Sequence, residues 1–210
     1  MPKQLPIILM VVLFVASLIF EVVAKKKRDE YSTSIIRLLA EGKYSEFEKE
    51  INSDKAKKLI PPANIDILKF NVAIMRGQNK EVEKIFDSFA NKRLSNDAKL
   101  TIYTRALGYF ITTNDVNRCK KCYEVVMGLP KNEQAKKSVQ RVYDIMVEKK
   151  TDKLDELLNE LDKVQNEQKY IDEFLISEIY TNLKDTENAN KYSELAKTHL
   201  MSEQVPDTQK

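Results

Sequence analysis

The chain has 210 residues, of which 42% are hydrophobic and 32% are charged, while glycine (4) and proline (6) are scarce and tryptophan is absent. This composition favours helices and argues against a β-sandwich, which needs many turn residues. Without Lys3, the run 25–28 and Glu21, the rest of the chain keeps 30 of the 35 basic and 31 of the 32 acidic residues, a net charge of −1. Nucleic-acid-binding proteins usually carry their positive charge on the folded surface, so no nucleic acid is expected as a partner.

The first predicted element is an apolar segment, residues 5–24. As a helix it is about 30 Å long, which matches the hydrocarbon core of a bilayer. Its one charged residue, Glu21, lies in the last turn, where the carboxylate can reach the membrane interface. We therefore expect one transmembrane helix, with residues 1–28 forming a membrane anchor with a basic flank.

A cleaved signal peptide, cut after Ala24, is the alternative for this segment. Signal peptides carry positive charge before the apolar core, whereas here Lys3 precedes it and four consecutive cations, 25–28, follow it. Basic flanks stay in the cytoplasm, so the pattern predicts a single-pass membrane protein with a cytoplasmic body. If the segment were cleaved, the body would be secreted or outward-facing, acting in envelope assembly or ligand binding.

The remaining chain repeats one pattern five times: an apolar helix end, a polar break and a second amphipathic run. The breaks recur at intervals of 35, 37, 35 and 35 residues, at Gly42, Gly77, Asn114, Lys149 and Lys184. Prolines separate some of the repeats because proline cannot continue a helix. No segment shows the alternating pattern of a strand.

The pattern predicts ten helices, over residues 30–40, 44–57, 63–76, 79–92, 96–112, 115–127, 132–148, 151–165, 168–183 and 186–202. Hairpins of about 35 residues cannot close a core alone, and they bury their apolar faces by stacking on neighbours. The predicted fold is therefore all-α, an α-solenoid of about five helix–turn–helix repeats over 29–202 after one N-terminal transmembrane helix. Residues 203–210 are expected to form a disordered tail.

These repeats resemble the tetratricopeptide (TPR) family. The fifth repeat carries Tyr180 before its turn and Ala189 and Ala196 in its second helix, and the third contains the stretch LGYF at 107–110. Where the family prefers alanine, the first, second and fourth repeats carry Phe47, Val82 and Leu154. The resemblance implies that the first helices of the repeats form a concave wall that binds a protein or peptide.

If the register of the family holds, this wall carries mixed apolar and polar side chains, which suit a helix or an extended apolar peptide. Some members clamp a C-terminal carboxylate with Lys, Asn and Arg; Asn71 fits that pattern, but Ile67 stands where a lysine would be needed. The expected partner-binding residues are Asn71, Met75, Thr104, Ile111, Tyr143, Met146, Phe174 and Glu178.

Cys119 and Cys122 form the most specific local motif of the sequence, CKKC. A thioredoxin-like site needs a strand before the helix, and a zinc site needs four ligands, of which His199 would be only the third. We therefore expect both cysteines to pack inside the fold. No phosphate-binding loop or nucleophile elbow is present, so the sequence predicts no catalytic residue, no metal and no cofactor. The predicted function is a membrane-anchored scaffold for protein–protein interactions.

Overall fold

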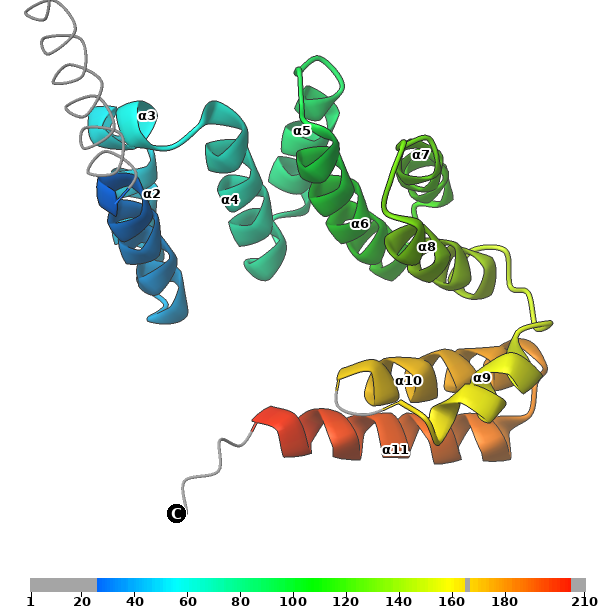
Figure 1. Cartoon of the computed structure of the whole chain (residues 1–210). Coiled ribbons are helices and arrows are strands. Elements are labelled where there is room, and N and C mark those ends of the chain that lie inside the picture. Colours follow the sequence, from blue (N-terminus) through cyan, green and yellow to red (C-terminus); the bar gives the residue numbers. More distant parts are fainter. Residues whose placement is uncertain (1–25, 165–166, 205–210) are drawn as a thin grey trace, which may run out of the picture. The chain divides into compact units, whose positions relative to one another are not determined.

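The computed structural model describes residues 26–164 and 167–204 (Figure 1). Every regular element in these ranges is a helix, which confirms the all-α prediction. The predicted transmembrane helix, 5–24, lies outside the described residues. Within them, no helix combines the length and the apolar character that crossing a bilayer requires.

Contacts divide the chain into two compact units, with the boundary between Leu94 and Ser95. This boundary falls inside the range predicted as one solenoid, so a single continuous array remains a prediction. The N-terminal unit contains a helix over residues 26–40, α2 (Tyr44–Ile51), α3 (Asp54–Leu59), α4 (Pro62–Met75) and α5 (Asn79–Phe89). The C-terminal unit contains α6 (Asn96–Thr112), α7 (Val116–Met127), α8 (Glu133–Met146), α9 (Leu154–Leu161), α10 (Glu167–Asn182) and α11 (Thr186–Gln204).

The second predicted helix, 44–57, is wrong, because the structure has two shorter helices there. Ser53 has an extended backbone, and its side chain accepts a hydrogen bond from the Ala56 amide at 3.1 Å. Serine at this position caps a new helix in preference to continuing the old one. The break turns α3 into a separate element with an exposed basic face.

Two apolar groups hold the N-terminal unit together. The first joins the helix 26–40 to α2, α3 and α4, and consists of Tyr31, Ile35, Phe47, Ile51, Ala56, Ile60, Ile65 and Val72. The second joins α4 to α5, where the ring of Phe70 lies 6.4 Å from Phe86 and meets Phe89 edge-on at 5.7 Å. Edge-on rings at this distance are favourable beyond the area that they bury.

In the C-terminal unit most helices pack on helices that are near them in the chain. α6 contacts α7, α7 contacts α8, and α10 contacts α8, α9 and α11. Figure 1 shows α10 and α11 as the two arms of one hairpin. The core around α10 contains Ile145, Leu157, Leu175, Ile176 and Ile179. The main local difference from the predicted helices in this unit is α9, which is shorter than 151–165 because residues 147–153 and 162–164 form turns and irregular chain.

The five predicted breaks share one backbone feature. All five residues have left-handed backbone, with φ of 69° at Gly42, 64° at Gly77, 56° at Asn114, 56° at Lys149 and 62° at Lys184. Left-handed backbone is strained for side-chain-bearing residues and easy for glycine. The breaks inferred from the sequence period are therefore the points at which the helices end.

Hydrogen bonds show how these turns close the helices. In four of the five, the amide after the left-handed residue donates to the carbonyl five residues earlier; examples are Lys43 to Leu38 at 2.8 Å and Asp185 to Tyr180 at 2.9 Å. This is the Schellman arrangement, which satisfies carbonyls left free at a helix end. At Lys149 the bond spans six residues, from Lys150 to Asp144 at 2.9 Å, and the connection is longer.

Substitution of Gly77 tests whether the left-handed turn stabilises the fold. A Cβ atom at Gly77 would meet no other atom within 4 Å, so Gly77→Ala changes only the backbone preference. We expect the free energy of unfolding to fall by about 1 kcal/mol, measured by urea denaturation followed by circular dichroism.

Gly108 provides the matched control, because it lies inside α6 and an added Cβ is equally free of contacts. Gly108→Ala should raise the free energy of unfolding by about 0.5–1 kcal/mol, since alanine is the better helix former. Equal effects of the two substitutions would contradict this account of the turn.

Candidate binding surfaces

An open groove of about 670 Å³ lies in the N-terminal unit. Side chains from α2, α4 and α5 line it, and apolar residues form its floor: Phe47, Ile51, Val72, Ala73 and Ile85. Its volume falls within the range of ligand-binding sites. An apolar floor in an open groove suits a peptide segment or a helix that lays one apolar face into it.

Polar side chains around the groove connect α4 to α2. The Lys69 ammonium donates to the Asn52 Oδ1 atom at 2.6 Å, and the Arg76 guanidinium forms an ion pair with Glu48. At the start of α5, Lys80 and Glu81 add one charge of each sign to the lining. The groove therefore combines an apolar floor with mixed charges, as protein–protein interfaces do.

The groove and the predicted concave wall use different faces of α4. An α-helix turns by about 100° per residue, so Lys69, Val72 and Ala73 share one face, and Asn71 and Met75 lie roughly opposite. Met75 is 54% exposed and Asn71 is half-buried. The sequence contained a signal for the groove, the i, i+3, i+4 spacing of residues 69, 72 and 73. The expected register of the tetratricopeptide family instead assigned the opposite face of this helix to binding.

The other predicted partner-binding residues lie in the C-terminal unit, in different environments. Thr104 on α6 and Phe174 on α10 are exposed, Phe174 at 44%. The half-buried residues of this group are Ile111, Met146 and Glu178. Met146 packs against the core around α10, which leaves little of it for a partner.

Tyr143 is buried at 6% exposure, and its ring stacks on Tyr123 with 4.3 Å between centroids. Burial, together with the nearby Glu148 carboxylate, raises the pKa of Tyr143 to about 12. This side chain joins α8 to α7 and is not displayed on a surface. Its predicted role in binding stays a prediction.

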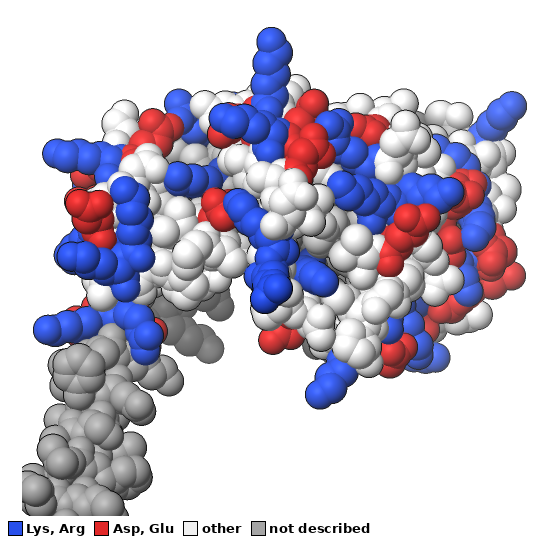
Figure 2. Space-filling view, turned by 90° about the horizontal axis from the view of Figure 1, so that it is seen from above, with Lys and Arg blue, Asp and Glu red and all other residues white. Residues whose placement is uncertain are grey.

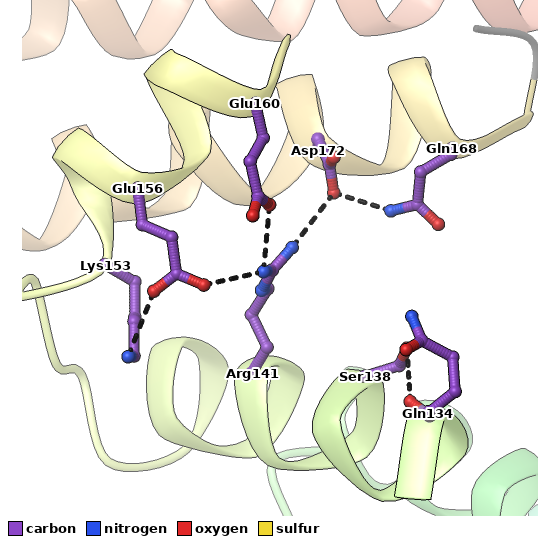
Figure 3. A network of polar contacts seen from close by, with 8 residues as sticks. All are labelled: Gln134, Ser138, Arg141, Lys153, Glu156, Glu160, Gln168 and Asp172. Atoms are coloured by element: carbon purple, nitrogen blue, oxygen red, sulfur yellow. Dashed lines mark hydrogen bonds and ion pairs between the residues drawn. The ribbon is translucent and has the colours of Figure 1, made fainter. Parts of the chain in front are cut away.

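A polar network in the C-terminal unit surrounds Arg141 (Figure 3). From α8, its guanidinium reaches Glu156 at 2.9 Å and Glu160 at 3.1 Å on α9, and Asp172 at 3.7 Å on α10. Gln168 donates to the same Asp172 carboxylate at 2.7 Å. One cation thus joins three helices.

Asp172 is the unusual member of this network, because its side chain is 1% exposed. Its Oδ2 atom has no hydrogen-bond partner among the described residues. Burial raises the pKa of this carboxyl, while Gln168 and Arg141 oppose the shift. A buried carboxylate is costly unless it is paired, so Arg141 is needed here for stability.

The cysteines are buried free thiols, as predicted. Burial raises the pKa of Cys119 to about 11 and also raises that of Cys122. Thiols of this kind are poor nucleophiles because little thiolate forms at neutral pH. His199 lies 2.7 Å from the buried Glu173 carboxylate, and the described residues contain no group of three potential metal ligands.

No model of a known protein family matches the chain, and comparisons with curated proteins and with solved structures find no match either. The resemblance to the tetratricopeptide family therefore remains an expectation from the sequence. The function has to be argued from the chain's own residues.

Arg141→Gln should lower the free energy of unfolding at neutral pH by about 3 kcal/mol, because it leaves Asp172 buried without a cation. Glu156→Gln removes another partner of the same guanidinium, but Glu156 is largely solvent-accessible, and the cost should stay below about 1 kcal/mol. Urea denaturation of both variants measures the difference. Similar costs would show that Asp172 has no special need for Arg141.

Asp172→Asn tests the raised pKa. The folded protein holds the Asp172 proton more tightly than the unfolded chain does, so this group stabilises the fold at low pH. That contribution is lost as the pH rises through the raised folded pKa. The stability of Asp172→Asn relative to the parent should therefore increase from about pH 4, the ordinary pKa of aspartate, up to the raised pKa of Asp172 in the folded protein. A difference that does not change with pH in urea denaturation would contradict the prediction.

Proposed function

We propose that the chain is a membrane-anchored adaptor, a TPR-like α-solenoid whose N-terminal unit binds a segment of a partner protein. The observation that carries the proposal is the recurrence of the left-handed turn at all five breaks, at intervals of 35 to 37 residues. A regular period with a left-handed residue at each break is typical of repeat arrays, whose usual role is to present extended binding surfaces.

Packing in the C-terminal unit supports stacked hairpins. α10 pairs with α11 and also contacts both α8 and α9, the two helices before it. Ile145 of α8 and Leu157 of α9 are fully buried in the core that includes Ile176 of α10. A hairpin that buries itself on the preceding one is the unit step of a solenoid.

The groove of the N-terminal unit is the surface best suited to a partner. Its floor is apolar, its rim carries charges of both signs, and three helices fix its walls. A helix or extended peptide can bury apolar side chains on the floor and exchange hydrogen bonds with the rim. The predicted wall, which includes Phe174, is the second candidate surface.

The anchor is proposed from the sequence alone, from the apolar segment 5–24 and the cations at 25–28. These cations favour a cytoplasmic position for the body. Attachment to a membrane restricts the adaptor to a surface and raises the effective concentration of partners there. The proposed role is therefore recruitment of a protein to the membrane.

Asn52→Trp tests the groove, because Asn52 lines it and is exposed. The indole should fill part of the groove and reduce capture of the partner by about tenfold or more, as loss of a central contact does. The measurement is quantitative mass spectrometry after affinity purification of the full chain from native membranes.

The matched control is Asn91→Trp, which places the same exposed side chain in the same unit away from the groove. It should capture as much partner as the parent. If Asn52→Trp also behaves like the parent while Phe174→Ala loses the partner, the binding surface is the predicted wall. If no protein is enriched with the parent chain, the adaptor function is wrong.

A further inference from the structure

We propose that the N-terminal unit has a second membrane contact, a basic surface that binds the headgroups of anionic phospholipids. The basic surface is formed by two elements, the first turn of the helix 26–40 and the short helix α3. Its cations are Lys26, Lys27, Arg28, Lys55, Lys57 and Lys58, and all six side chains are exposed. This inference rests on the proposed membrane anchor but not on the proposed partner.

Tyr31 holds the two elements together. Its hydroxyl donates to the Glu50 Oε2 atom at 2.9 Å and lies 3.2 Å from the Ser53 Oγ atom. Ser53 is the residue that caps α3. The tyrosine side chain is buried, so this contact fixes the position of α3 beside the helix 26–40.

The same contact brings Lys27 and Lys55, which are distant in the sequence, close together. The Lys55 ammonium lies 4.4 Å from the centroid of the Tyr31 ring. Lys27 and Lys55 line one shallow hollow of about 350 Å³, together with Glu30 and Tyr31. A lipid phosphate that contacts the membrane-proximal run is therefore within reach of α3.

Part of this charge is available to a ligand. Lys26 forms a long ion pair with Glu30 at 3.9 Å, and Lys57 pairs with Asp54 at 3.4 Å. Both pairs are exposed, and exposed pairs are weak enough for a phosphate to replace.

Three further cations of the basic surface are Lys27, Arg28 and Lys58. Within the part of the chain that the structure describes, none of them forms an ion pair. Figure 2 shows several Lys and Arg side chains at the left, with acidic side chains among them, and further basic side chains over the rest of this face.

The basic surface follows the predicted transmembrane span in the chain, so a lipid headgroup is its expected ligand. The described chain begins at residue 26, directly after the predicted span 5–24 and Lys25. Basic residues this close to a span face the headgroups of the cytoplasmic leaflet, where each adds about fivefold to binding of anionic lipid. In the folded protein the lysines of α3 add to this contact. The basic run 25–28 alone would not provide them.

Hydrogen exchange of the full chain in lipid nanodiscs tests the contact. The discs contain phosphatidylcholine alone or with about 30% phosphatidylserine, a typical anionic fraction for such tests. We expect phosphatidylserine to slow exchange of the α3 amides by about fivefold or more at about 0.05 M salt, and the effect to disappear at about 0.5 M salt, where charges are screened.

Lys57→Gln/Lys58→Gln should abolish most of this slowing. The matched control is Lys84→Gln/Arg93→Gln, which removes two exposed cations of the same unit that lie outside both the basic surface and the groove and should leave the slowing unchanged. If phosphatidylserine does not change the exchange rate of the α3 amides, the inference is overturned. Such a result would leave the proposed partner capture unaffected. Equal slowing by RNA in phosphatidylcholine discs would overturn the inference in favour of a general polyanion site, and a chain recovered outside the discs would overturn the anchor as well.

Discussion

The structure depends on how its helices end. At each of five breaks one residue adopts a left-handed backbone, and in four of them the next amide bonds the carbonyl five residues earlier. This closure satisfies the free carbonyls of the first helix and reverses the chain, so that a second helix can return along the first. Glycine fills the position twice. Where Asn114, Lys149 and Lys184 fill it, the strain has to be offset by packing of the hairpins that the turns connect.

Packing between hairpins explains why the C-terminal unit tolerates a buried charge. A hairpin of two short helices buries too little apolar surface to be stable alone, so α10 has to pack on α8 and α9. Asp172 lies at this junction, and Arg141 reaches it from the preceding hairpin. A buried ion pair adds little net stability, but it penalises any arrangement that separates its members. The network around Arg141 therefore specifies which faces of the three helices meet.

The sequence predicted the helices and their breaks well, because both depend on local signals. The 35-residue period located even the breaks at Lys149 and Lys184, although lysine is not typical of a left-handed turn. It missed the break at Ser53, where a single capping hydrogen bond outweighs a continuous helical pattern. It also missed the groove and the burial of Tyr143. Periodicity shows which residues share a face, but the neighbour that covers each face is decided by tertiary packing, which the periodicity of a single sequence does not show.

The two proposed contacts of the N-terminal unit meet on one short segment, residues 50–53. Glu50 and Ser53 hold Tyr31, and with it the basic surface, while Ile51 and Asn52 line the groove. This segment contains the break between α2 and α3, where the helical hydrogen bonds of the backbone are interrupted. A lipid that orders the basic surface would therefore also order one wall of the groove, and a partner in the groove would strengthen lipid contact by the same factor, because coupling between two binding sites is reciprocal. Such coupling would let the adaptor hold its partner more tightly at an anionic membrane than at a neutral one.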